Sequence, residues 1–130
     1  MKTKMLLIVI LLALAAQAGF GQTANEWSSR GVQYYNQGDY PNAIECFLKA
    51  KDIHERTIGK EHPDYATSLN NLGALYRNMG DYAKAERYLL EGIAIDEKAL
   101  GKEHPDYAGS LNNLGALYYN MGDYAKAERY

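Results

Sequence analysis

LNNLGALYRNMGDYAKAERY, residues Leu69–Tyr88, sets the architecture of this 130-residue chain. The same sequence returns almost unchanged as Leu111–Tyr130, 42 residues later. A more diverged copy lies 42 residues earlier, where Gly38-Asp39-Tyr40 matches Gly80-Asp81-Tyr82. A fixed period of about 20 to 50 residues is typical of proteins built from stacked structural units. The sequence therefore predicts a row of similar units.

Each full copy predicts two helices joined by a short turn. The spacing of one helix face links four residues in the first half: Leu69, Leu72, Gly73 and Tyr76. Gly80-Asp81 ends that helix, and a second helical pattern begins near Tyr82. A glycine inside an exposed helix costs about 1 kcal/mol relative to alanine. Gly73 therefore predicts a close approach of the second helix, which the small residues Ala85 and Gly92 would allow.

The first unit carries a spaced set of large and small residues at Trp27, Gly31, Tyr34, Ala43 and Phe47. At these positions it resembles the tetratricopeptide repeat, whose pattern is W-x2-L-G-x2-Y…A-x3-F, in its long-period, kinesin-light-chain-like form. The period is 42 residues, longer than the usual period of about 34, and the extra residues fall in the between-unit segment Thr57–Pro63 and its copy Ala99–Pro105. The motifs LNNLG and GKEHPDYA are similar to those of the long-period form. The resemblance covers residues 24–130. It implies an all-α fold, a right-handed superhelical solenoid of antiparallel helix hairpins.

The repeat period, together with the distinct composition of the first residues, divides the chain into five segments. They are a signal peptide at 1–18, a short lead-in at 19–23, and repeat units at 24–65, 66–107 and 108–130. The third unit stops inside its second helix, so we expect this chain to be a fragment of a longer protein. A half hairpin also predicts that Leu114 and Tyr118 are partly uncovered.

The first residues predict export from the cell. Lys2 and Lys4 precede the apolar run Met5–Ala16, and Ala16-Gln17-Ala18 supplies a small-x-small cleavage pattern. This order is typical of a secretory signal peptide. The apolar run would reach only ~18 Å as a helix, short of the ~30 Å hydrocarbon core of a membrane. We expect a periplasmic or secreted protein with no membrane span after cleavage; the alternative is an uncleaved anchor.

Charge and motifs limit the classes of function. Fourteen lysines and arginines stand against 16 aspartates and glutamates, which argues against a nucleic-acid partner, because such a partner needs clustered basic residues. No nucleophile–base pair, phosphate-binding loop or HExxH motif occurs in the sequence. We therefore predict that this chain is not an enzyme and has no cofactor, no metal site and no evident small-molecule substrate.

Two histidines that could bind a metal and one cysteine that could react have structural interpretations instead. His62 and His104 each precede Pro-Asp, which is a typical helix start, and they lie one full unit apart. We interpret them as helix-start residues rather than metal ligands. Cys46 is the only cysteine, so in an exported protein it is either a buried thiol or an intermolecular bridge. Its neighbour Phe47 favours the buried thiol.

The candidate binding site is one face of the first helix in units two and three, opposite the hairpin-packing residues. This amide-rich face consists of Asn70, Asn71, Arg77, Asn78, Asn112, Asn113, Tyr119 and Asn120. The matching positions of unit one are Ser28, Ser29, Val32, Tyr35 and Asn36. Asparagine is a mediocre helix former, but its donors and acceptor suit the backbone of an extended peptide. The alternative is that these amides are needed for packing between units.

The resemblance implies that this helix lines a concave groove that binds peptides. We therefore expect a non-catalytic scaffold in the bacterial envelope, with a protein or extended peptide segment as partner. The alternative is the N-terminal recognition arm of a larger enzyme or signalling protein. Long-period arrays of this kind occur in proteins that end in a caspase-like protease or a histidine-kinase domain.

Overall fold

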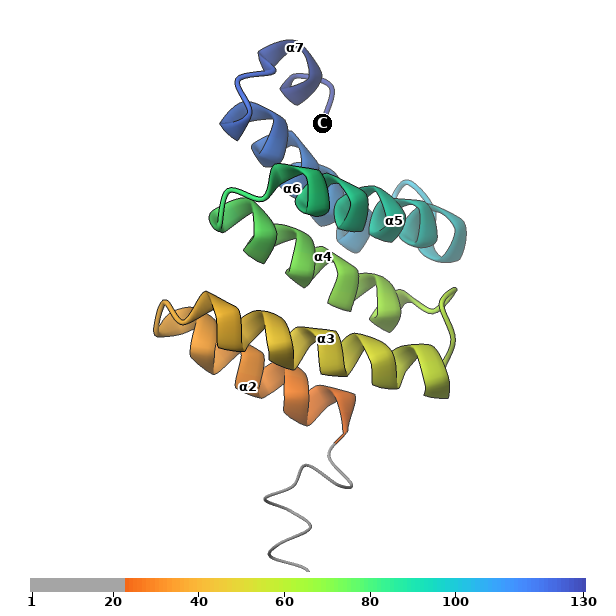
Figure 1. The fold of residues 1–130 in the computed structure, drawn as a ribbon. Coiled ribbons are helices and arrows are strands. Elements are labelled where there is room, and N and C mark those ends of the chain that lie inside the picture. The colour runs from red at the N-terminus through yellow and green to blue at the C-terminus, as the bar shows by residue number, and fades with distance from the viewer. Residues whose placement is uncertain (1–22) are drawn as a thin grey trace, which may run out of the picture.

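The computed structural model describes residues 23–130; the predicted signal peptide at 1–18 lies outside them. The described part contains α2 (Ala24–Asn36), α3 (Tyr40–Thr57), α4 (Pro63–Asn78), α5 (Tyr82–Leu100), α6 (Pro105–Asn120) and α7 (Tyr124–Ala127). The helices pair as the hairpins α2–α3, α4–α5 and α6–α7, which stack into one elongated array (Figure 1). The prediction of an all-α array of helix hairpins is confirmed.

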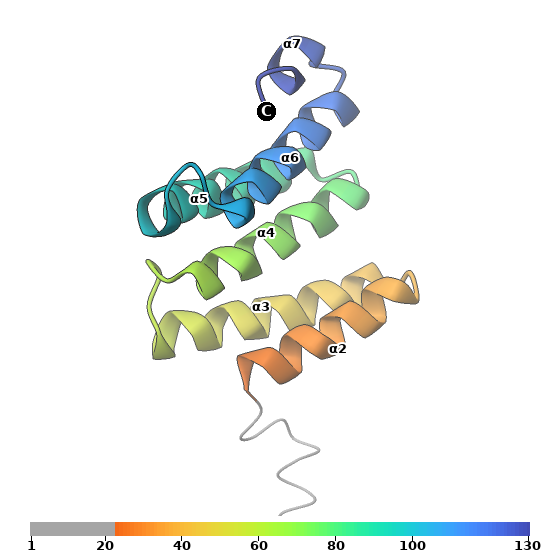
Figure 2. The same cartoon turned by 180° about the vertical axis from the view of Figure 1, so that it is seen from behind.

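The core is a seam that runs from one hairpin to the next. Between α3 and α4, buried Ala43, Ile44 and Phe47 meet Leu72 and Leu75. Viewed from behind, α2 and α6 lie in front of α3 and α5 (Figure 2). The second helix of a hairpin thus packs on two sides, against its own partner and against the first helix of the following hairpin. No helix among residues 23–130 has the length and apolar character needed to cross a membrane.

Local sequence signals explain where each hairpin turns. Gly80 has a φ of 81°, a backbone conformation that favours glycine. Its N–H bonds to the carbonyl of Arg77, and the N–H of Asp81 bonds to the carbonyl of Tyr76 at 2.9 Å, which closes the end of α4. The Asp81 carboxylate then accepts a bond from the backbone N–H of Lys84 and caps α5. The turns after α2 and α6 repeat this arrangement.

The HPD segments start α4 and α6, as predicted. The Nδ1 atom of His62 accepts a bond from the backbone N–H of Asp64 at 3.0 Å, and His104 does the same for Asp106 at 3.1 Å. Each histidine is therefore an N-cap, followed by proline in the first helical turn. The structure confirms their helix-start role.

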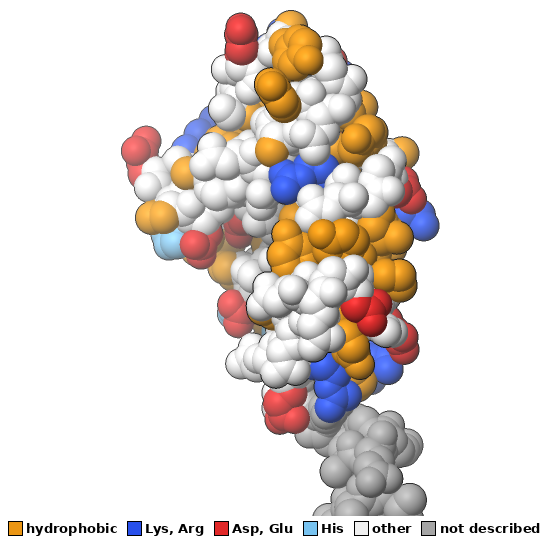
Figure 3. Space-filling model, turned by 90° about the vertical axis from the view of Figure 1, so that its left-hand side faces the viewer, with side chains coloured by type: hydrophobic (Ala, Val, Ile, Leu, Met, Phe, Trp, Pro, Cys, Tyr) orange, Lys and Arg blue, Asp and Glu red, His pale blue; other side chains and the backbone are white. Residues whose placement is uncertain are grey.

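The end of the array departs from expectation. Leu114 and Tyr118 are 0% and 5% exposed, so the prediction that they are partly uncovered is wrong. Both join one cluster with Leu89 and Ile93 of α5, which covers them from the preceding unit. The exposed apolar side chains there are Tyr119, Met121, Tyr124 and Tyr130 instead. Figure 3 shows apolar patches along the side where the hairpin turns lie.

Close helix approach explains the glycine inside α4. A Cβ atom placed on Gly73 would lie 2.5 Å from Cγ of Leu89, a buried side chain of α5. The carbonyl oxygen of Ala85 would lie 3.3 Å away. On the facing helix, a Cβ on Gly92 would lie 3.3 Å from the carbonyl oxygen of Ala66. The two helices can therefore pack at this distance only with small residues at these positions.

The near-identical third unit provides a matched control for this interpretation. We expect Gly73→Ala to lower the free energy of unfolding by about 1–3 kcal/mol, because Leu89 must move in a packed core. Gly115→Ala should be neutral or stabilising by up to about 1 kcal/mol, since its Cβ would meet Tyr130 at 3.4 Å, an ordinary contact. Thermal unfolding followed by circular dichroism measures both. Equal destabilisation by the two variants would contradict the proposed role of close approach.

Candidate functional site

The structure divides the amide-rich face into two groups. Asn113 Nδ2 donates to Asn70 Oδ1 at 3.0 Å, a bond from α6 to α4. Asn78 Nδ2 donates to the hydroxyl of Tyr35 at 3.2 Å, a bond from α4 to α2. Both bonds join the first helices of neighbouring hairpins. These three amides therefore contribute to packing between units, the alternative interpretation of the asparagine pattern.

The remaining five predicted residues have no side-chain hydrogen bond within residues 23–130. They are Asn71, Arg77, Asn112, Tyr119 and Asn120. Tyr119 is 64% exposed, and its ring meets that of Tyr124 edge-on, with 5.3 Å between ring centroids. Asn112 and Asn120 are exposed, whereas Asn71 and Arg77 are half-buried. Asn112, Tyr119 and Asn120 therefore keep exposed donors and acceptors that a ligand can reach.

A hollow of about 300 Å³ lies between α2 and α4. Its lining is Val32, Tyr35 and Asn36 from α2, Phe47 from α3, and Asn71, Ala74 and Leu75 from α4. Val32 and Tyr35 are 47% and 41% exposed, although both carry large apolar groups. A mostly apolar lining with a few amides is the usual composition of a binding pocket, and the volume is at the small end of the usual range.

The sequence analysis identified only some of the residues that line this hollow. Asn71 belongs to the predicted site, while Val32, Tyr35 and Asn36 were recognised only as its matching positions in unit one. Phe47 is predicted only as a position of the repeat pattern, and its place in the lining of the hollow is not predicted. The Phe47 ring can lie here because residue 31 is a glycine. A Cβ atom at that position would lie only 3.0 Å from the ring. The 42-residue offset was the signal that could have extended the site to α2.

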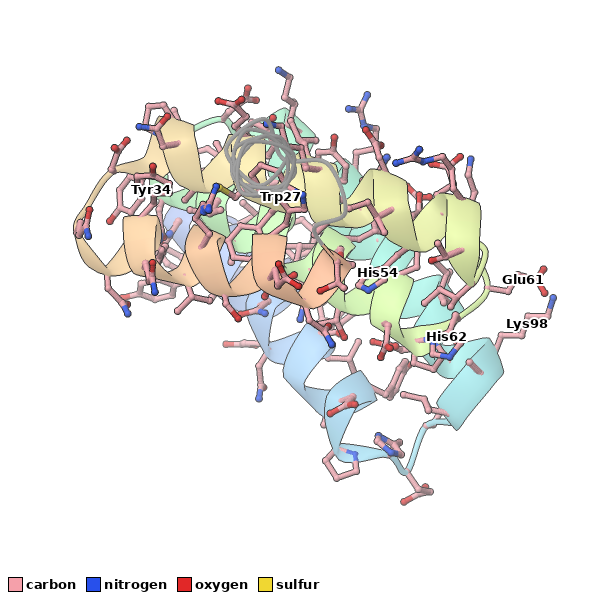
Figure 4. The ribbon with its side chains drawn as sticks, turned by 90° about the horizontal axis from the view of Figure 1, so that it is seen from below. Trp27, Tyr34, His54, Glu61, His62 and Lys98 are labelled. Carbon is pink, nitrogen blue, oxygen red and sulfur yellow. The ribbon has the colours of Figure 1, made fainter. Side chains whose placement is uncertain are left out.

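A second hollow, of about 270 Å³, lies beside the loop between α3 and α4. It is lined by Lys60, Glu61, Glu91, Ala94, Ile95 and Lys98. Glu61 and Lys98 form an ion pair of 3.3 Å (Figure 4). Because both side chains are largely exposed, this pair contributes little to stability. Charges of both signs partner one another here, so this site is a weaker candidate than the hollow beside Asn71.

Buried polar pairs hold consecutive hairpins at corresponding positions. His54 Nδ1 lies 3.0 Å from Ser68 Oγ, which places His54 of α3 against the start of α4 (Figure 4). One period later, Ser110 Oγ donates to Asp96 Oδ2 at 2.9 Å. Burial raises the pKa of the Asp96 carboxyl, and the Ser110 bond partly opposes this. Nearby Asp106 also raises that pKa, while His104 lowers it.

Cys46 is the remaining residue whose side chain could act as a nucleophile. Its side chain is 4% exposed, and it is a free thiol. The preference for a buried thiol is confirmed. Burial raises the pKa of the Cys46 thiol, an effect that the positive charges of Arg30 and Lys49 partly oppose. A raised pKa leaves less thiolate, so Cys46 is suited to packing rather than to nucleophilic chemistry.

The stacked hairpins, with a polar face and a hollow on their first helices, define a helical-repeat protein. The tetratricopeptide repeat family model matches residues 22–98 and 71–130. The chain belongs to the tetratricopeptide repeat family, and the resemblance seen in the sequence is confirmed. Repeats of this family are typically non-catalytic and serve as scaffolds for protein–protein interaction.

Solved structures share this architecture. The crystal structure of BtubC (BKLC) from P. vanneervenii has a TM-score of 0.79 at 24% identity, over 92% of this chain and 49% of that one. A putative kinesin light chain from Podosopora anserina with nearly identical TPR-like repeats has a TM-score of 0.72 at 26% identity, over 79% and 49%. This chain spans about half the length of these structures. No curated protein matches it.

The buried Asp96 makes the junction between units two and three sensitive to pH. A folded-state pKa above the ordinary value of about 4 means that folding disfavours the charged carboxylate. This penalty is absent below about pH 4, grows as the pH rises through the raised pKa, and is constant above it. We therefore expect Asp96→Asn, which can still accept the Ser110 bond, to raise the melting temperature at pH 7.

The gain in melting temperature should disappear below about pH 4, where the Asp96 carboxyl is protonated in both the folded and the unfolded state of the original chain. Melting curves at pH 7 and pH 3.5 test this. Asp52→Asn is the control, because the Asp52 side chain is 64% exposed. A lower melting temperature for Asp96→Asn at pH 7 would show that the junction needs the charge.

Proposed function

We propose that this protein is an exported scaffold that binds an extended polypeptide segment across α2, α4 and α6. One apolar side chain of the segment would enter the hollow lined by Val32, Phe47 and Leu75. The observation that supports this proposal is the hollow of about 300 Å³, which is lined in part by Asn71. The Asn71 amide has no side-chain hydrogen bond within residues 23–130. Membership in the tetratricopeptide repeat family supports a protein partner.

The contacts available suggest how a segment would be held. Burying one large apolar side chain stabilises a complex by about 1.5–3 kcal/mol. The amides of Asn36 and Asn71 can bond to the peptide backbone, and each such bond nets about 0.5–1.5 kcal/mol. These gains must offset the ordering of the peptide, so the affinity per unit is modest. A tight complex needs several hairpins acting in series.

A charge placed at the mouth of the hollow tests this proposal. We expect Val32→Lys to weaken the retention of a random peptide library by about tenfold, because an apolar side chain can no longer be buried there. Leu90→Lys is the matched control: Leu90 is 43% exposed, close to the 47% of Val32, but lies on α5 and outside the hollow. Library retention on immobilised protein measures binding, and circular dichroism checks the fold.

Three results are informative. Loss of binding in Val32→Lys alone supports the hollow as the binding site. Equal losses in both variants indicate a general effect of charge. Unchanged binding in both, with an intact fold, places peptide binding elsewhere and overturns the proposal.

The export part of the proposal rests on the order of basic, apolar and small residues in 1–18. We expect N-terminal sequencing of the protein exported by a bacterial host to begin at Gly19, or within a few residues of it. Leu12→Arg interrupts the apolar run and should block both export and cleavage. Intact Met1 in the mature protein would argue for an uncleaved anchor.

A further inference from the structure

We propose that Met79 and Met121 are the sites at which this protein is oxidised by hydroperoxides, and that the only cysteine, Cys46, is not. Met79 and Met121 are the only methionines of residues 23–130. They lie 42 residues apart, at the same place in units two and three. Neither methionine lines the hollow or belongs to the amide-rich face, so the oxidation site is separate from the proposed peptide-binding site.

Each methionine ends the first helix of its hairpin. Met79 is the C-cap of α4 and Met121 is the C-cap of α6, and each is followed by a glycine with positive φ. Their backbone N–H groups bond to the carbonyls of Leu75 and Leu117, one turn earlier in the same helix. The two methionines are 49% and 45% exposed. A thioether usually fills a gap in a core, but these two lie at hairpin turns that a small oxidant can reach.

Cys46 has the opposite environment. It is buried in α3, at 4% exposure. Thiol oxidation proceeds through the thiolate, so burial, which raises the pKa of the Cys46 thiol, also lowers the fraction that can react. A thioether needs no deprotonation to act as a nucleophile. Exposure and ionisation therefore both favour the methionines over the thiol.

The reaction balances with hydrogen peroxide as the oxidant. The methionine sulfur donates a lone pair to one peroxide oxygen, and the O–O bond breaks. The departing hydroxide takes the proton of the transferred oxygen and leaves as water. Sulfur is oxidised by two electrons while the peroxide is reduced. The product is methionine sulfoxide, a polar group that sulfoxide reductases with a thiol reductant can convert back.

Unit one shows that the turn accepts a polar side chain at this place. Its aligned residue is Gln37, which is also unbranched and is exposed. The backbone angles agree closely, since φ and ψ are −85° and −4° at Gln37 and −83° and −6° at Met79. A sulfoxide can therefore be hydrated here, as the Gln37 amide is. Oxidation should change the turn surface from apolar to polar and leave the fold intact.

The test exposes the folded 130-residue chain to hydrogen peroxide and locates added oxygen by peptide mass spectrometry. We expect one oxygen atom on Met79 and one on Met121, and none on Cys46 until denaturant is added. Circular dichroism should show unchanged helicity. Met1 and Met5, in the predicted signal peptide, are measured on separate peptides.

Matched variants test the role of position. Gln37→Met should add a third oxidised turn, because the backbone there is nearly the same. Leu72→Met places a thioether in the core, where Leu72 is 0% exposed, and should stay unoxidised while Met79 is fully converted. Exchange of leucine for methionine conserves volume and is usually tolerated. Leu117→Met, at a second buried position, replaces Leu72→Met if that variant does not fold.

The double variant Met79→Gln/Met121→Gln makes both turns resemble that of unit one. It should elute earlier than the original chain from a phenyl matrix, because two exposed apolar side chains are replaced by polar ones. Oxidation of the original chain should shift its elution in the same direction. Peroxide should shift the elution of the double variant less.

Oxygen on Cys46 before Met79 or Met121 overturns this assignment. Equal oxidation of the buried methionine in Leu72→Met, or no oxidation of Gln37→Met, also overturns it, because exposure at the turn would then not set the reactivity. Loss of helicity on oxidation contradicts a change confined to the turn surface. Selective oxidation of Met79 and Met121 in an intact fold supports the assignment, whether or not the chain binds peptides.

Discussion

Burial of the second helix of each hairpin against the first helix of the next is the interaction on which the array depends. One hairpin cannot cover both apolar sides of α3 or α5. Phe47 is buried in one cluster with Leu72 and Leu75 of the next hairpin. Leu89 is shared in the same way between α4 and α6. Stability in such an array comes from interfaces between neighbours as much as from the units themselves.

This dependence explains why small and polar residues recur at fixed places. Glycine at position 73 lets Leu89 approach α4, so that one leucine can serve two interfaces. The buried pairs at 54/68 and 96/110 lie at the same junction position, and each is satisfied by its partner on the next hairpin. Polar groups buried in this way specify how neighbouring hairpins align. They hold the first helices at the spacing that forms the amide-rich face.

The amide-rich face has one role that the structure shows and one that we propose, divided residue by residue. Asn70, Asn78 and Asn113 use their amides between units, whereas Asn71 lines the hollow and has no side-chain hydrogen bond within residues 23–130. An array that binds along this face must keep its helices aligned with some side chains and present others to the ligand. Units two and three are nearly identical and differ on this face at one position, where one has Arg77 and the other Tyr119.

The sequence alone determined the helices, their turns and the family, because these depend on signals within a few residues of each other. Gly80-Asp81 ends one helix and caps the next, and His62-Pro63 starts another. Only the tertiary structure decided which side chains meet across hairpins. The cover that α5 provides over Leu114, the bond between Asn113 and Asn70, and the hollow beside Phe47 depend on residues about half a repeat to one repeat apart in the chain. Their contacts depend on how neighbouring hairpins are oriented, which local spacing does not encode.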